Sequence, residues 1–229
     1  MMDTLSLIRG LRFIDSFFPS GGFAYSSGLE AAVQGGAVRS SDELSQYVQD
    51  LLRHGMGRRE AVAVALAHDA VSKKMLRIAL DADRELDTMK TGRESRQASC
   101  QMGRQVIRIA AEQMGGCSIL RDFHAAVEAE RTSSHLAVSL GLALAASGWS
   151  REDAVSAYLY QTATGLMSAA LKLLPIGQRE GQRLLDGWMP VIAELSGQAH
   201  PDTTMTSWSP VQDIYAMRHG RLESRLFRS

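Results

Sequence analysis

Histidine, cysteine and carboxylate side chains are the residues from which a metal or catalytic site could be built, and few of them have a suggestive spacing. His124 and Glu128 are four residues apart on an expected helix and therefore share one face, and His135 follows further along. These three side chains could line a small pocket that binds a metal or another ligand. A resident zinc or nickel ion needs three or four converging ligands, which the sequence does not show. We therefore expect an ordinary helical pair here and no metal site.

Sequence motifs of enzymes are also missing. The chain contains no GxxxxGK(S/T) phosphate-binding loop, no HExxH pair, no GxSxG and no GxGxxG after a strand. The carboxylates at Asp81, Asp83 and Glu85 fall on different faces of a helix, so we expect them to be solvated rather than catalytic. The sequence thus indicates a protein that is not an enzyme and that carries no cofactor.

Cysteine usage and hydropathy indicate a cytoplasmic protein. Cys100 and Cys117 form no CxxC motif and have no Cys/His metal spacing, so we expect two reduced thiols. The first residues lack the basic and apolar regions of a signal peptide. The longest apolar stretch, near residues 136–146, is too short to span a bilayer, so no membrane association is expected.

The charge balance argues against a nucleic-acid partner. Lys plus Arg and Asp plus Glu number 25 each, whereas proteins that bind nucleic acid usually carry a basic excess. A helical DNA-binding regulator is therefore disfavoured, and no nucleic acid is expected as a partner. A net charge near zero also weakens self-repulsion, which favours association between copies of the chain.

The elements that must position any site are helices. Strong helix formers dominate and no alternating strand pattern is present. Ser40, three residues before Glu43, predicts a capped helix start, and Ser150 predicts another. The expected helices, some of which should merge, are 5–17, 25–34, 41–56, 58–70, 73–80, 83–90, 93–115, 119–129, 133–147, 151–173, 178–196 and 207–218.

This pattern predicts an all-α fold, a single-domain helical bundle of about ten helices. No shift in composition marks a domain boundary and there is no internal repeat, so residues 1–229 form one domain. Residues 198–210 are expected to form a loop. On composition and spacing alone, the prediction stops at a soluble helical domain.

Two segments do not fit a plain helical core. Residues 17–30, FFPSGGFAYSSGLE, combine four aromatic side chains with proline and three glycines, which specifies a particular turn. Residues 217–229, MRHGRLESRLFRS, hold four arginines against one glutamate and have an apolar side. We expect this tail to be flexible and to add little to the core. It should become ordered only when it binds a partner that accepts hydrogen bonds from its arginine side chains and contacts its apolar side chains.

These segments resemble motifs of the urease accessory protein F (UreF) family. Residues 17–30 resemble the family's FP-x-GGF-x-YS-x-GLE motif, and the tail resembles its MRH and SRLFRS signature, departing from it at residues 220–223. Residues 172–178, KLLPIGQ, are similar to a KL-x-P-x-GQ block. The stretch from Glu94 to Arg104 is similar to an arginine-rich helix that precedes MGR. The resemblance covers residues 5–229.

The resemblance implies an all-helical scaffold that helps to deliver nickel to urease. Such a protein forms a homodimer and binds a second accessory protein of the UreD/UreH type. The pair then recruits a nickel-carrying GTPase of the UreG type, and the assembly engages apo-urease. The implied role includes modulation of GTP hydrolysis but no chemistry of the scaffold's own. A small helical enzyme with a pocket near His124, Glu128 and His135 is the alternative.

Residue by residue, the resemblance assigns three groups of contacts. Glu30 and Lys172 are expected to form surface that faces the GTPase, and Tyr25 is expected to shape the first loop. The contact with the UreD/UreH-type partner is expected from six tail residues: Arg218, His219, Arg225, Leu226, Phe227 and Arg228. Arginine and buried aromatic anchors carry most of the affinity in such interfaces, and charges tune specificity.

Overall fold

Serine side chains cap the two helices whose starts the sequence predicted. The Ser40 hydroxyl accepts a hydrogen bond of 3.2 Å from the backbone N–H of Glu43, and the Ser150 hydroxyl accepts one of 3.1 Å from Asp153. Each bond satisfies a backbone donor that the first turn of a helix leaves without a partner. Helices α3 (Ser41–Asp50) and α9 (Arg151–Leu173) begin at these caps.

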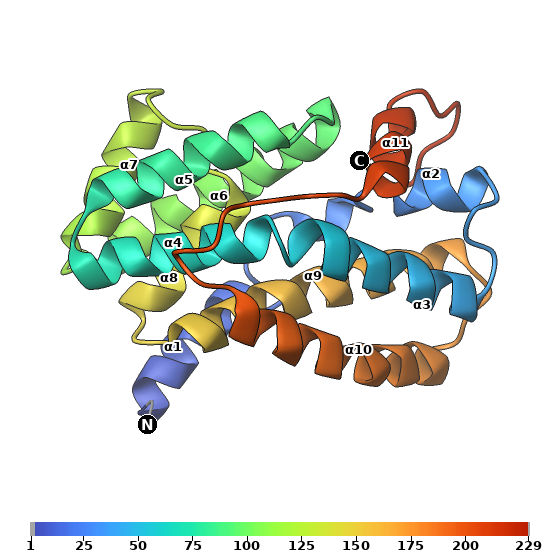
Figure 1. Ribbon diagram of the computed structural model, residues 1–229, viewed down its shortest axis with the longest axis horizontal. Coiled ribbons are helices and arrows are strands. Elements are labelled where there is room, and N and C mark those ends of the chain that lie inside the picture. Colours follow the sequence, from blue (N-terminus) through green and yellow to red (C-terminus); the bar gives the residue numbers. More distant parts are fainter. Residues whose placement is uncertain (1–2, 229) are drawn as a thin grey trace.

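The computed structural model describes residues 3–228, in which there are eleven α-helices and no strand (Figure 1). This confirms the predicted all-α class; position 229 of the expected tail lies outside the described residues. The remaining elements are α1 (Thr4–Ile14), a 3₁₀ turn η1 (Gly22–Ala24), α2 (Leu29–Gln34), a π-helical segment η2 (Leu51–Met56), α4 (Glu60–Lys73), α5 (Leu76–Met89), α6 (Arg93–Gln113), α7 (Ser118–Glu128), α8 (Leu136–Ala146), α10 (Gln178–Gln198) and α11 (Pro210–His219).

Several helix boundaries differ from the prediction. The segments expected at 73–80 and 83–90 form one helix, α5, because no glycine or proline interrupts them. The helix expected from residue 25 begins only at Leu29, since Gly28 has φ +85°, which no helical residue adopts. The helix expected to reach residue 56 changes to π-helical hydrogen bonding at Leu51, and π segments often occur near functional sites.

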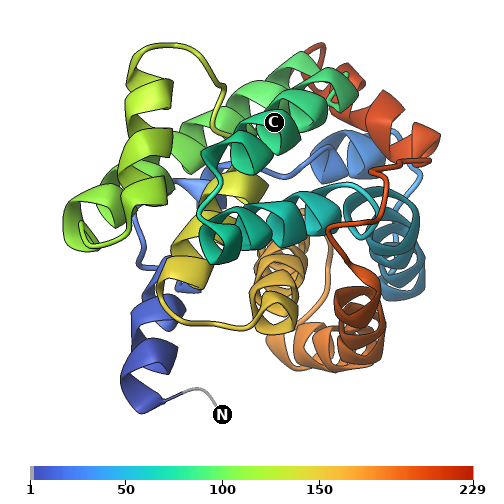
Figure 2. The same ribbon diagram turned by 60° about the vertical axis from the view of Figure 1, so that its left-hand side comes forward.

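Helix α8 forms the centre of the core. Residues 137–144 of α8 are all buried, and α4, α6 and α9 surround them. Alanine, serine and glycine make up half of these positions, so the neighbouring helices can approach closely. Helix α9 packs along α10, and α5, α6 and α7 cover the opposite side of α4 and α8 (Figure 2).

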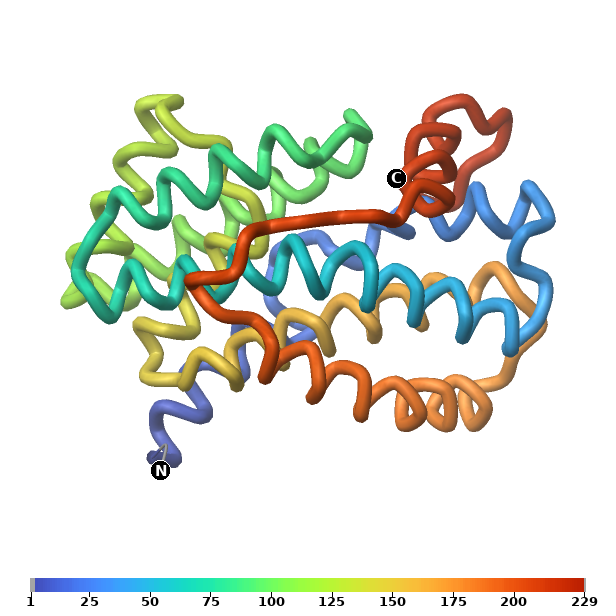
Figure 3. The backbone as a smooth tube through the Cα atoms, viewed as in Figure 1, coloured from blue at the N-terminus to red at the C-terminus, as the bar shows by residue number. Residues whose placement is uncertain are grey.

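An extended segment brings the end of the chain back to its beginning. After α10, residues 199–209 cross the junction between η2 and α4, where the Trp208 N–H donates to the His54 carbonyl at 2.7 Å and the Thr206 N–H to Arg58 at 3.1 Å. This crossing carries α11 to the side of α2 (Figure 3). The residues expected to form a loop do so, and the loop determines where the last helix lies.

None of the helices in the described part combines the length and the apolar character that crossing a membrane requires.

Candidate functional site

The N-terminal loop, residues 17–30, and the chain's last residues form one continuous structure. Helix α11 packs against α2 where they meet, and Gly28 makes the close approach possible. A Cβ atom at Gly28 would lie 2.8 Å from the backbone nitrogen of Ala216, closer than such atoms pack, and its φ of +85° also favours glycine. The GLE part of the loop motif therefore requires glycine for two independent reasons.

Glu30 is the carboxylate at the centre of this contact. Its side chain lies close beneath the tail and is fully buried. One oxygen accepts a hydrogen bond of 2.7 Å from the Leu226 N–H, and the other lies 3.2 Å from the Phe227 nitrogen and 2.8 Å from His219 Nε2. Burial by itself raises the pKa of Glu30, but the tail's backbone donors and His219 outweigh it and hold the pKa below its ordinary value.

A second carboxylate, Glu94 at the start of α6, faces His219 from the other side. Glu94 Oε2 lies 3.0 Å from His219 Nδ1, and its Oε1 accepts a hydrogen bond of 3.1 Å from the Arg225 guanidinium. Both nitrogens of the buried imidazole therefore point at carboxylates, one on α2 and one on α6. A doubly protonated ring can donate to both carboxylates at once.

Phe227 anchors the tail in the hydrophobic core. Its ring is buried among core residues, and the Lys172 ammonium lies 5.3 Å from the ring centroid, within the range of a cation–π contact. The backbone also holds the tail, since the Arg228 N–H donates to the Ala24 carbonyl at 2.8 Å. The Gln34 side chain adds a hydrogen bond of 3.1 Å to the Ser224 carbonyl.

All four sequence blocks that carry the family resemblance therefore meet at one place. We call this contact the tail junction and define it by Glu30, Glu94, Lys172, His219, Arg225 and Phe227. Sequence reasoning assigned Glu30 and Lys172 to one partner and the tail to another. In the structure they belong to a single cluster.

Most of the predicted site residues in and around the tail junction are at the surface. Lys172, Arg218, Arg225, Leu226 and Arg228 are exposed, and Leu226 is the most exposed apolar side chain of the tail at 72%. Arg218 lies over the ring of Tyr215 at 5.8 Å. Tyr25 is half-buried, and its hydroxyl donates to Gln101 on α6 at 2.6 Å, which ties the loop to that helix.

Two expectations about these residues are wrong. Glu30 forms no part of an accessible surface, because the tail covers it and uses its carboxylate as an acceptor. The tail was also expected to add little to the core, yet Phe227 and His219 are buried, and α11 extends through His219. In this structure the tail lies against α2 and α6 with no partner chain; its ordering by a partner stays a prediction.

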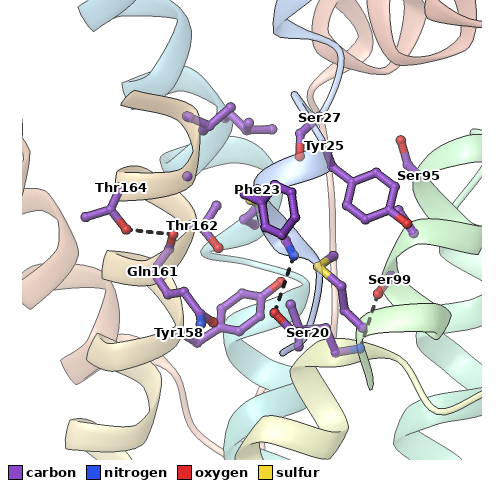
Figure 4. Close-up of a pocket in the computed structure, with 18 of the residues that line it drawn as sticks. Ser20, Phe23, Tyr25, Ser27, Ser95, Ser99, Tyr158, Gln161, Thr162 and Thr164 are labelled. Atoms are coloured by element: carbon purple, nitrogen blue, oxygen red, sulfur yellow. Dashed lines mark hydrogen bonds between the residues drawn. The ribbon is translucent and has the colours of Figure 1, made fainter. Parts of the chain in front are cut away.

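A cavity of about 490 Å³ lies next to the loop, between α6, α9 and α11 (Figure 4). Aromatic rings and hydroxyl groups are prominent in its lining, with Tyr25 and Phe23 from the loop, Tyr158 from α9 and Ser99 from α6 among them. Four charged side chains also reach it, namely Asp15, Arg59, Lys90 and Asp213, so the lining suits a polar molecule or ordered water.

An ion cluster forms one wall of this cavity. The Glu60 carboxylate is fully buried and accepts hydrogen bonds from Arg59 at 3.1 Å and from Lys90 at 2.6 Å. Burial raises the pKa of Glu60, but the two cations outweigh it and bring the pKa down to about 2. The carboxylate is therefore ionised at neutral pH and is paired directly with both cations, which leaves the cluster with one net positive charge.

The alternative, a pocket around His124, Glu128 and His135, is not present, and the expected ordinary helical pair is found instead. His124 pairs with Glu128 at 3.5 Å on the outside of α7. His135 lies elsewhere, buried beside Asp87 and Cys100, because the loop before α8 turns it towards α5 and α6. Among the described residues, Asp87, Cys100 and His135 are the one group of three or more metal-ligating side chains whose ligand atoms lie within 4.8 Å of one another.

Sequence reasoning missed this group and also missed Glu94 as the second partner of His219. The ligating residues are far apart in the chain, and no spacing rule connects them. The block that begins at Glu94 gave a usable signal, because it resembled a family motif, but its role depends on a contact 125 residues away.

Comparisons with known proteins find relatives that match this chain over nearly its whole length and theirs. A family model described as UreF matches residues 38–188. The urease accessory protein UreF of Methylorubrum populi is 32% identical over 240 residues, which cover all of both chains. The protein of that name from Actinobacillus pleuropneumoniae serotype 3 is 29% identical over 221 residues, 96% of this chain and 97% of the relative. The one from Bacillus sp. strain TB-90 is 27% identical over 97% of this chain.

Proposed function

This chain belongs to the UreF family of urease accessory proteins, and we propose that it acts as a scaffold in the delivery of nickel to urease. In this proposal it binds a second accessory protein of the UreD/UreH type. The pair recruits a nickel-carrying GTPase of the UreG type to apo-urease and modulates the hydrolysis of GTP by this GTPase. The scaffold works in the cytoplasm as a homodimer and performs no chemistry itself.

The observation that carries this proposal is the convergence of the four family-like blocks on the tail junction. A contact built from Glu30, Glu94 and His219 contributes no reactive group to the cavity, so its role is to hold a surface in one shape. Next to it, Leu226 and Phe23 expose apolar surface on two segments that the Arg228–Ala24 hydrogen bond joins. Exposed apolar anchors within a charged rim are typical of protein–protein contacts.

The exposed arginines of the tail supply that charged rim. Arg218, Arg225 and Arg228 are all exposed, and guanidinium groups bind carboxylates through two parallel hydrogen bonds. We therefore propose that the UreD/UreH-type partner presents an acidic surface with an apolar pocket for Leu226. Lys172, which is exposed on α9 beside Phe227, extends this surface towards the GTPase.

The test is co-purification together with urease maturation in cells that lack the native scaffold. Leu226→Asp and Arg228→Glu should each abolish co-purification of the UreD/UreH-type partner and leave urease inactive. Arg77→Glu is the matched control, because Arg77 is 87% exposed on α5 and away from the tail. Tail variants that restore urease activity as well as the control does would contradict the proposal.

A further inference from the structure

We propose that Asp87, Cys100 and His135 form a binding site for one divalent transition-metal ion of the cobalt, nickel and zinc class. The three side chains come from three elements: the end of α5, the middle of α6 and the residue that caps α8. They offer one oxygen, one sulfur and one nitrogen ligand, a mixed set that suits ions of intermediate softness.

Two of the three distances between the ligand atoms are near those around a tetrahedral ion, and all three atoms lie within 4.8 Å of one another. His135 Nε2 lies 3.0 Å from Asp87 Oδ1, and Cys100 Sγ lies 3.9 Å from the same nitrogen. Ordinary zinc–ligand bond lengths at a tetrahedral angle would separate nitrogen from oxygen by about 3.4 Å and nitrogen from sulfur by about 3.6 Å. Adjustments of a few tenths of an ångström would bring these two distances to the tetrahedral values, and the Cys100 side chain, whose sulfur lies 3.7 Å from His135 Nδ1, would turn towards Nε2.

A second layer of contacts fixes the histidine. The Asp83 carboxylate accepts hydrogen bonds from the backbone N–H groups of Ser134 and His135, at 2.8 and 2.7 Å. The loop before α8 lies so close to α6 that a Cβ atom at Gly103 would overlap the Ser134 carbonyl. This close packing holds the imidazole over the face of α6 that carries Cys100, so the site needs little reorganisation to form.

Ser99 completes the arrangement by fixing the second ring nitrogen. Its hydroxyl lies 3.1 Å from His135 Nδ1 and accepts a hydrogen bond of 3.3 Å from the Leu136 N–H. With the ring proton on Nδ1 pointing at this hydroxyl, the lone pair on Nε2 is free for the ion, which is the support that metal-bound histidines usually have. Metal binding would thus replace the contact between His135 and Asp87 without disturbing Ser99.

The local charge and exposure also favour a cation. Asp83 and Asp87 lie on one side of the site, and a thiolate at Cys100 would balance the second charge of the ion together with Asp87. Asp87 and Cys100 are half-buried whereas His135 is fully buried, so an ion could enter from solvent and keep water as its fourth ligand. Among the permanent cations, Arg96 pairs with Asp87 at 3.8 Å, too far for a strong competing hydrogen bond, and Lys90 and Arg104 act on the site through their charge.

Cobalt is the probe that separates this site from accidental binding. The full-length protein, stripped with a chelator, is titrated with Co²⁺ while the thiolate-to-cobalt charge-transfer band and the visible bands of tetrahedral cobalt are recorded. We expect one ion per chain, a band that disappears in Cys100→Ser and a band that persists in Cys117→Ser, the matched control for a half-buried free thiol. Displacement by Zn²⁺ and by Ni²⁺ then ranks the ions.

Two further variants keep the proposal falsifiable if Cys100→Ser folds poorly. Asp87→Asn, at a half-exposed position, should abolish the tetrahedral cobalt spectrum, whereas His124→Asn on the surface of α7 should not. Ser99→Ala should weaken Co²⁺ binding about tenfold without removing the thiolate band. A wild-type chain that gives no thiolate band, or a band that Asp87→Asn and Cys100→Ser leave unchanged, would overturn the site.

Discussion

Two buried glutamates, Glu30 and Glu60, show two ways of compensating a charge inside the same fold. Glu60 has two permanent cations as partners, Arg59 and Lys90, and all three residues belong to α4 or to the segments that flank α4 and α5. Glu30 instead accepts hydrogen bonds from two backbone N–H groups and faces a histidine, and these three partners all come from the last residues of the chain.

The two glutamates differ in whether their hydrogen-bonding partners can move away from them. The cations around Glu60 are held by the body of the protein, so the cluster is a fixed part of the core and breaking it costs folding free energy. The partners of Glu30 leave together if the tail leaves, and the carboxylate then gains water in their place. A buried carboxylate whose partners lie on a detachable tail suits a surface that assembles with other proteins. A carboxylate paired with cations in the body of the fold suits a permanent core.

The largest effect is expected from Glu60. Glu60→Gln leaves Arg59 and Lys90 buried without a counter-charge, so the free energy of unfolding should fall by about 3–5 kcal/mol. Urea unfolding at neutral pH measures this change. Asp81→Asn is the control, because Asp81 pairs with two arginines at the exposed surface of α5 and should cost at most about 1 kcal/mol. Equal losses of unfolding free energy in the two variants would contradict the assignment of Glu60 as a buried carboxylate held by two cations.

Removal of the tail should have the next largest effect. A chain that ends at Ala216 loses the burial of Phe227 and the hydrogen bonds at Glu30, so unfolding should become easier by about 2–3 kcal/mol. The same truncation in a Glu30→Gln background should cost less, because one partner of the contact is already gone. Additive costs would show that Glu30 and the tail act independently.

Acid should release the tail through Glu30. The folded-state pKa of Glu30 is below its ordinary value of 4.5, so the stabilisation is complete above pH 4.5 and is lost as the pH falls through the lowered pKa. Protection of the Leu226 and Phe227 amides from hydrogen exchange should decrease in this window, after correction for intrinsic rates. Glu30→Gln should show no such step. For Glu60 the corresponding loss extends from pH 4.5 down to about 2.

The smallest effect is expected at the rim of the tail junction. Arg225→Ala removes a half-exposed ion pair with Glu94, and water and salt screen such pairs, so the cost to stability should be at most about 1 kcal/mol. Arg53→Ala, which breaks a similarly exposed pair with Glu194, is the stability control. A cost above 2 kcal/mol for Arg225→Ala, by chemical unfolding, would make Arg225 part of the buried contact instead.

The sequence predicted the parts of this molecule that depend on local rules. Ser40 and Ser150 cap their helices as expected, and the periodicity identified nearly every helix, because both depend on residues a few positions apart. The burial of Glu30 could not be predicted, since its partners lie some 190 residues further along the chain. The contacts of His135 with Asp87 and Cys100 could not be predicted for the same reason, because its ring is positioned by a loop and not by a helix face.

The distance along the chain between the two halves of the tail junction also has a consequence for how the protein is made. The hydrogen bond from Phe227 to Glu30 spans 197 residues, so it can form only after all the helices have been synthesised. The helices of the body are complete by then, and domains generally fold from the N-terminal side during synthesis. A chain that stops before residue 217 would therefore fold most of its core but lack the junction, and it would not display the finished surface for assembly.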